Sequence, residues 1–190
     1  MTSRAHLALS LAALLALSAT ACAGGGSQRY VNPNADVSTM RAVAVLPMQN
    51  LTANPLAAER VQRIFVTELV ALGAFDVIEP GQVLRTIRKE NVDLNALTVD
   101  DLKRLAKALN ADGLFLGAVL EFEDARAGAP AANVTLQMRL VEGASATTLW
   151  SSSRTSTGAT WTARLFGVGG QTSAAVAELL IHDELQVFGR

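Results

Sequence analysis

The order of hydrophobic patterns between Arg41 and Phe188 constrains the fold of this chain more than any other feature. Strand-like and helix-like segments follow one another in the order β-α-β-α-α-β-β-β-α. A helix between two strands favours parallel neighbours, whereas strands joined by short turns form an antiparallel meander. We therefore expect a single α/β (α+β) domain over residues 41–190, with a five-stranded mixed sheet and helices packed on it.

The expected strands differ in how much of each is buried. The apolar, β-branched run Arg41–Met48 is typical of a buried strand. Val134–Val141 alternates apolar and polar residues, as a strand with one buried face does. Ala146–Thr155 is polar enough to lie at an edge of the sheet. The two other expected strands are Ala74–Ile78 and Asp112–Phe122. We expect the core to include Val43, Val45, Leu116, Leu136 and Leu140.

The expected helices have recognisable ends. Leu56–Leu72 carries an apolar stripe at helical spacing, and Gly73 follows it as a C-terminal cap. The segment Thr98–Asp101 is close to a capping box, with Asp in the place of the usual Glu or Gln. The other expected helices are Gly81–Asn91, a helix from Thr98 through Leu109, and Thr172–Phe188.

The first residues have the pattern of an export signal. Arg4 gives a short positive region, and Leu7–Leu17 is almost purely apolar. This run is shorter than the ~20 residues needed to cross a hydrocarbon core. Small residues follow it, so the pattern predicts a secretory signal peptide over residues 1–21 rather than a membrane-spanning helix.

The single cysteine, Cys22, lies directly after the small residues Ala19-Thr20-Ala21. This arrangement resembles the lipobox of bacterial lipoproteins, although that family usually has Leu where Ala19 stands. The resemblance implies acylation of Cys22, with a diacylglycerol and an N-acyl chain such as palmitate. The alternative is an ordinary Ala-x-Ala signal peptide followed by a buried cysteine. A lone cysteine excludes internal disulfides and multi-cysteine zinc sites.

The residues around the cysteine bear on where the protein lies. Ala23 stands where enteric bacteria have Asp in lipoproteins retained at the inner membrane, so we expect the periplasmic face of the outer membrane. Ala23–Met40 is rich in Gly and polar residues, a flexible-linker composition with a typical reach of ~23 Å. We expect residues 22–40 to form a lipidated N-terminus and a flexible tether.

Four segments, taken in order, resemble the CsgG-type bacterial lipoproteins. This superfamily includes the curli-secretion lipoprotein, the penicillin-binding-protein activator lipoproteins and the N-terminal domain of TolB. The resemblance covers Arg41 to Phe188 and implies a non-enzymatic envelope protein that acts through protein contacts, including contacts with itself. The segments that carry it are Ala42–Pro47 with Asn50-Leu51, Phe75–Glu79, Ala106–Gly117 and Thr148–Ser151.

The same resemblance leaves narrower functions open. A subunit of a curli-type secretion pore needs extra membrane strands of ~9–11 residues paired in hairpins, and all five expected strands are used in the sheet. Activators of peptidoglycan synthases have long tethers, whereas the tether expected here is short. The formal net charge of −1 gives no electrostatic reason to expect a nucleic-acid partner.

No combination of side chains predicts catalysis, a metal or a cofactor. Gly167–Ser173 resembles a phosphate-binding loop, but Gln171 stands where the pattern requires Lys. His182 has no nucleophile with which to work as a base. Glu121, Glu123 and Asp124 would suit calcium, but a solvated strand end is the simpler interpretation. We therefore expect a protein that is not an enzyme.

The segment Trp161–Val168 is unusually apolar for a loop. Its large side chains stand among Thr, Ala, Arg and Gly residues. A lid packed over the sheet is the first interpretation. An exposed segment that contacts a partner or the membrane surface is the second. The residues concerned are Trp161, Leu165, Phe166 and Val168.

Overall fold

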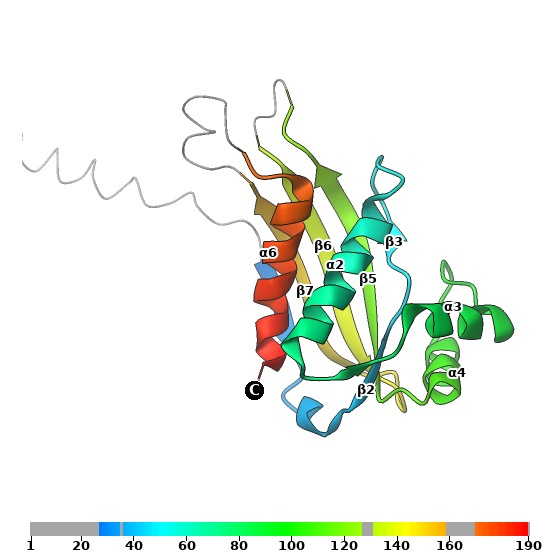
Figure 1. Ribbon diagram of the computed structural model, residues 1–190. Coiled ribbons are helices and arrows are strands. Elements are labelled where there is room, and N and C mark those ends of the chain that lie inside the picture. Colours follow the sequence, from blue (N-terminus) through cyan, green and yellow to red (C-terminus); the bar gives the residue numbers. More distant parts are fainter. Residues whose placement is uncertain (1–26, 35, 127–130, 159–169, 190) are drawn as a thin grey trace, which may run out of the picture.

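The computed structural model describes residues 27–34, 36–126, 131–158 and 170–189, and these contain one seven-stranded sheet (Figure 1). The strand order is β1-β7-β6-β5-β2-β4, and β3 also pairs with β5. The strands are β1 (Ser27–Val31), β2 (Ala42–Val45), β3 (Gln49–Asn50), β4 (Asp76–Val77), β5 (Gly113–Glu123), β6 (Asn133–Glu142) and β7 (Thr148–Thr157).

The pairing directions agree with the expected mixed sheet. Strand β2 pairs in parallel with β4 and β5, and helices connect these strands along the chain. Strands β5, β6 and β7 form the expected antiparallel meander. The predicted number of five strands is wrong, because β1 and the two-residue β3 also belong to the sheet.

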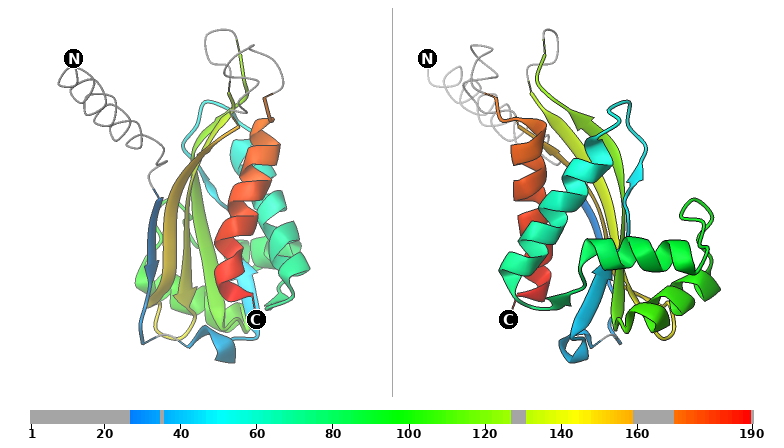
Figure 2. Two further views of the ribbon diagram at one scale, coloured as in Figure 1. Left: turned by 90° about the vertical axis from the view of Figure 1, so that its left-hand side faces the viewer. Right: turned by 45° about the vertical axis from the view of Figure 1, so that its right-hand side comes forward.

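Helices lie on both faces of the sheet (Figures 1 and 2). One face is covered by α2 (Ala57–Leu72) and α6 (Ser173–Leu185), which also contact each other. On the other face, α3 (Pro80–Lys89) and α4 (Val99–Leu109) cover only the region around β2 and the start of β5. Short 3-10 helices are formed by Val37–Thr39 and Gln186–Phe188, labelled η2 and η3.

Local sequence explains where these helices begin and end. Helix α2 ends at Gly73, whose φ of +67° is the left-handed conformation that glycine adopts without strain. Helix α4 begins with the predicted capping box, in which Thr98 and Asp101 exchange hydrogen bonds. Helix α6 has Thr172 as its N-cap, and the Thr172 hydroxyl accepts from the Ala175 N–H.

The larger core lies between the sheet and helices α2 and α6. Five aromatic rings meet there edge to face, with ring centroids 5.2 to 6.2 Å apart. The predicted core residues Val43, Val45, Leu136 and Leu140 are buried in this core. The rings belong to Phe65, Phe75, Phe115, Trp150 and Phe188.

The prediction for Leu116 is wrong. Phe115 occupies the large core, so its neighbour Leu116 points to the opposite face of the sheet, because side chains alternate along a strand. That face is covered only in part, and Leu116 is therefore half-buried. The strand is apolar on both faces, and its sequence alone does not show which face is the better covered.

The expected flexible tether over residues 22–40 is wrong for Ser27–Val31, which form β1. Strand β1 pairs along its length with β7, in a register that runs from Ser27 opposite Arg154 to Val31 opposite Trp150. Strand β7 is therefore an inner strand and not the edge that its polar sequence suggested. The predicted signal peptide, residues 1–21, and Cys22 lie outside the described residues.

Among the residues that the structure describes, no helix has both the length and the apolar character needed to span a bilayer.

Candidate functional site

Several side chains predicted to be functional lie outside the described residues. They are Cys22 and the four apolar side chains Trp161, Leu165, Phe166 and Val168. The described residues on either side of the latter segment are close together, since the Gln171 N–H donates to the Gly158 carbonyl at 3.3 Å. Whether this segment is a lid or a contact site therefore stays a prediction.

The three carboxylates at the end of β5 do not converge. Glu121 accepts from the Thr135 hydroxyl at 2.8 Å, and Glu123 pairs with Arg126 at 3.1 Å. Asp124 instead accepts from the Ser173 N–H at 2.8 Å, a hydrogen bond that lowers the pKa of the Asp124 carboxyl. No group of three metal-ligating side chains occurs within the described part of the chain.

His182 lies on the outer side of α6, as a surface residue would. Its Nδ1 is 2.9 Å from a carboxylate oxygen of Glu68 on α2, and its Nε2 is 3.2 Å from the Gln186 amide nitrogen. These contacts link two helices and involve no Ser, Thr or Cys that a base could activate. The prediction of a surface or boundary residue is confirmed.

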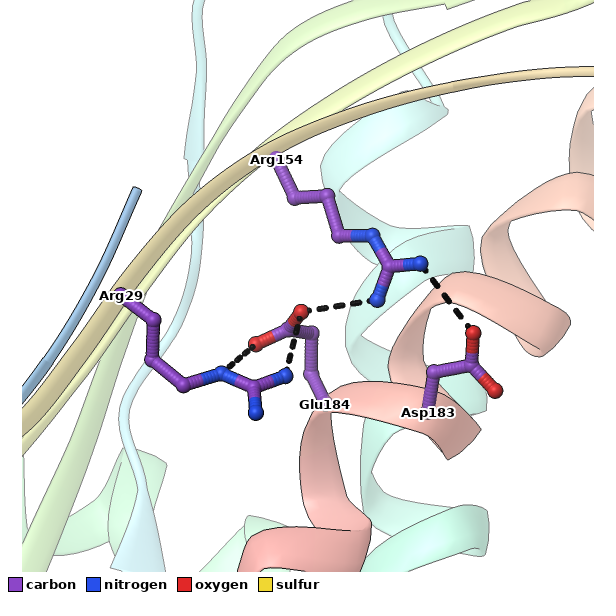
Figure 3. A network of polar contacts seen from close by, with 4 residues as sticks. All are labelled: Arg29, Arg154, Asp183 and Glu184. Carbon is purple, nitrogen blue, oxygen red and sulfur yellow. Dashed lines mark hydrogen bonds and ion pairs between the residues drawn. The ribbon is translucent and has the colours of Figure 1, made fainter. Parts of the chain in front are cut away.

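A network of two arginines and two carboxylates joins β1 and β7 to α6 (Figure 3). Arg29 of β1 donates to both carboxylate oxygens of Glu184, at 3.2 and 2.9 Å. Arg154 of β7 donates to Glu184 at 2.9 Å and to Asp183 at 3.2 Å. The network therefore ties the first strand and an inner strand to the last helix.

Glu184 is the buried centre of this network, with 0% of its surface exposed. Burial by itself would raise the pKa of Glu184, but Arg29, Ser152 and Arg154 together outweigh it and lower the pKa. Glu184 is therefore ionised at neutral pH. Since a buried charge is tolerated only with partners, the network has a structural role in holding β1 on the sheet.

The main open surface is a groove on the sheet face that α2 and α6 do not cover. Its volume is about 750 Å³, and the loop between α3 and α4 forms one of its walls. Polar and small side chains from four strands alternate with those that enter the large core. The groove is lined by Gln28 and Tyr30 of β1, Ser151 and Ser153 of β7, Gln137 and Arg139 of β6, Leu116 and Ala118 of β5, Pro47, and loop residues 94–97.

These side chains suit contact better than chemistry. Hydroxyl and amide groups donate and accept hydrogen bonds, and Tyr30, which is 48% exposed, offers an aromatic ring beside them. Tyr and Arg are enriched among the residues that dominate protein–protein interfaces. We call this surface the open face.

A smaller hollow of about 460 Å³ lies where β6 turns into β7, and Asp112 and Glu142 are among its lining residues. Asp112 accepts from the backbone N–H groups of Arg41 and Ala42 at 2.8 and 2.9 Å. The hydrogen bonds from Ala42 and Arg41 lower the pKa of the Asp112 carboxyl. Asp112 therefore anchors β2 and is not a free acid.

Sequence reasoning missed the network, although one signal was present. In α6, Glu184 continues a stripe of buried residues that includes Leu180 and Ile181. A carboxylate at such a position needs a cationic partner from another element. Arg154 was visible within an expected strand, but Arg29 lay in a segment interpreted as a tether.

Comparison with known proteins establishes the fold. No protein-family model matches the chain, and no curated protein matches it. Among solved structures, the PelC dodecamer from Paraburkholderia phytofirmans is similar, with a TM-score of 0.58 and 20% identity over 87% of this chain and 98% of that one. Lipoprotein GNA1162 from Neisseria meningitidis has a TM-score of 0.55 and 16% identity, over 77% of this chain and 97% of that one. The chain therefore has the same fold as these two proteins.

Proposed function

We propose that this protein is a CsgG-type envelope lipoprotein, anchored through acylated Cys22, that acts through protein contacts and has no catalytic activity of its own. The observation that carries the proposal is the position of the single cysteine, directly after an apolar run and three small residues. Ala23 favours the periplasmic face of the outer membrane.

The fold supports this proposal without specifying a partner. GNA1162, which has the same fold, is described as a lipoprotein, and PelC was solved as a dodecamer. By analogy with the dodecamer, we propose that a second copy of this chain is among the partners. The open face, with Tyr30 and Arg139, is the surface we assign to that contact.

The narrower alternatives fit less well. All described strands pair within one sheet, which leaves none of them for a membrane hairpin of a secretion pore. A synthase activator must reach across peptidoglycan. Since β1 begins at Ser27, only five residue steps separate Cys22 from the sheet, a span of at most ~17–18 Å. We therefore favour an accessory role in envelope assembly or secretion over a pore subunit and over a synthase activator.

Replacement of the cysteine tests the anchor. Cys22→Ser should leave unprocessed precursor and should reduce the amount of protein in the outer-membrane fraction after a high-salt wash. The matched control is Thr20→Ser, which keeps a small residue beside the cleavage point and should fractionate like wild type. Retention of Cys22→Ser in the washed outer membrane would contradict lipid anchoring through this residue.

The contact role is tested on the open face. Tyr30→Ala combined with Arg139→Ala should reduce the size of the detergent-extracted protein in light scattering, with the melting temperature nearly unchanged. The control is Leu179→Ala, which removes an equally exposed side chain from α6 on the other side of the sheet. An assembly of unchanged size would exclude the open face as the contact surface.

A further inference from the structure

Strand β1 fixes where the N-terminal anchor leaves the domain. The sheet register places Ser27 opposite Arg154, Arg154 opposite Leu136, and Leu136 opposite Val119. Val119 in turn lies opposite Asn50 of β3. These residues form one row across the sheet, so Ser27 has a defined height along the strands.

The direction of β1 at Ser27 is fixed as well. Because β1 is antiparallel to β7, the N-terminal end of β1 points in the direction in which β7 runs toward Thr157. The loop from Leu51 to Leu56 and the end of β5 lie on the same side of this row. Figures 1 and 2 show that the C-terminus lies at the opposite end of the sheet. We call the end with Leu51, Leu56 and Thr157 the anchor end.

Distances then exclude one orientation. The five residue steps from Cys22 to Ser27 span at most ~17–18 Å. Thr157 is three residues beyond Arg154, or ~10 Å, toward the anchor end. Thr148 is six residues before Arg154, or ~20 Å in the other direction. Even a fully extended segment from Cys22 would therefore fall short of the end of the sheet near Thr148, whereas the end near Thr157 lies well within its reach.

The lateral edge of the sheet is also a poor membrane contact. Strand β1 is the last strand of the described sheet, so its outer edge has no strand partner. Hydrocarbon cannot satisfy unpaired backbone N–H and C=O groups, whereas water can. The edge near Val31 is therefore better left in solvent, which leaves the anchor end.

The anchor end has the surface that a bilayer requires. Leu51 and Leu56 are 64% and 48% exposed, and they flank a turn braced by Asn50. The Asn50 side chain accepts from the Thr52 N–H at 3.1 Å and donates to the Asn54 carbonyl at 2.8 Å. The exposed apolar side chains are thus carried by an ordered turn.

Most of the acidic side chains at this end have partners. Glu123 at the end of β5 is paired with Arg126 at 3.1 Å, Asp124 accepts from the Ser173 N–H, and Glu121 accepts from the Thr135 hydroxyl. Exposed leucines beside side chains that are held in this way suit the interfacial layer of a membrane. We propose that the anchor end lies against the lipid surface, with Leu51 and Leu56 in contact with it, and that the open face stays accessible to protein partners. This inference rests on the proposed acylation of Cys22.

A single labelled thiol can report this orientation, because acylation leaves no other cysteine free. Leu51→Cys is the test position, and Val187→Cys, 39% exposed at the opposite end, is its matched control. Val31→Cys reports on the lateral edge. Each full-length, lipidated protein is labelled with an environment-sensitive dye and incorporated into phosphatidylcholine–phosphatidylglycerol vesicles. Flotation first establishes anchoring, and spin-labelled lipids then quench the dye.

The expected result is quenching several-fold stronger at Leu51 than at Val187 or Val31. A Gly-Ser spacer of about 12 residues inserted before Ser27 should preserve flotation and reduce the Leu51 signal to that of Val187. Equal quenching at Leu51 and Val187 in a floating protein would overturn the orientation alone, and stronger quenching at Val31 would assign the membrane contact to the β1 edge. Loss of flotation would overturn the lipid anchor and this inference with it.

Discussion

Replacement of Arg154 in the buried network by alanine should destabilise the fold more than replacement of an arginine in an exposed ion pair. Breaking a buried ion pair typically costs 3–5 kcal/mol, because a buried charge is left without a partner. In Arg154→Ala, Glu184 keeps the two hydrogen bonds from Arg29. Because this partner remains, we expect a smaller loss for Arg154→Ala, about 1–3 kcal/mol, although solvent partly screens Arg29, which is 39% exposed.

The double variant Arg29→Ala with Arg154→Ala should cost more than either single change. It leaves Glu184 buried without either arginine, and the expected loss approaches the full 3–5 kcal/mol. Guanidinium titrations followed by tryptophan fluorescence measure the free energy of unfolding. Arg63→Ala is the control, since Arg63 and Glu59 form a 3.4 Å pair in which both side chains are exposed, and such pairs contribute below about 1 kcal/mol.

The difference in free energy of unfolding between wild type and the double variant should also depend on pH. The folded-state pKa of Glu184 is lowered, so its contribution to stability is present at neutral pH and is lost as the pH falls through its folded-state value. In the double variant, burial without the two arginines raises that pKa. The deficit of the double variant should therefore shrink as the pH is lowered from neutral toward the ordinary range of a carboxyl group. A loss for Arg154→Ala no larger than for Arg63→Ala, or a deficit independent of pH, would refute this account of the network.

Three further changes test other parts of the structure. Leu136→Ala should cost ~2–5 kcal/mol in a denaturant titration, since Leu136 is buried in the large core, and a loss below about 1 kcal/mol would contradict its placement. Thr98→Ala removes the capping box of α4 and should cost about 1 kcal/mol by the same titration, whereas Thr52→Ala in the β3–α2 loop leaves α4 intact. If Trp161–Val168 is a packed lid, Trp161→Ala with Phe166→Ala should lower the melting temperature by roughly ten degrees, at ~2–4 °C per kcal/mol of lost stability. If the segment is a contact site, the same double change should reduce association with little change in melting temperature.

Elements with strong periodicity could be predicted from the sequence. The buried positions of α2 recur every four residues, and β6 alternates from Asn133 to Leu140, so one local pattern was enough to identify each element. Strand β1 has no such pattern. Its sequence is polar and follows a glycine run, and what makes it a strand is pairing with β7 together with the contact from Arg29 to Glu184, 155 residues away along the chain.

The candidate functional residues could likewise be predicted only where they are contiguous in the sequence. Cys22 could be predicted because the lipobox resemblance depends on contiguous residues. The open face could not, because its side chains come from separate strands and the loop between α3 and α4. Which face of β5 is open depends on how far α3 and α4 extend across the sheet, and this is decided by packing between distant segments.

The chemical state of Cys22 is the most direct test of the proposed function. Mass spectrometry of the N-terminal peptide, from protein purified out of envelope membranes, reads this state without any substitution. We expect a mature chain that begins at Cys22 and carries a diacylglycerol and an amide-linked acyl chain. A mature chain with an unmodified Cys22 thiol, or one cleaved at another position, would contradict it.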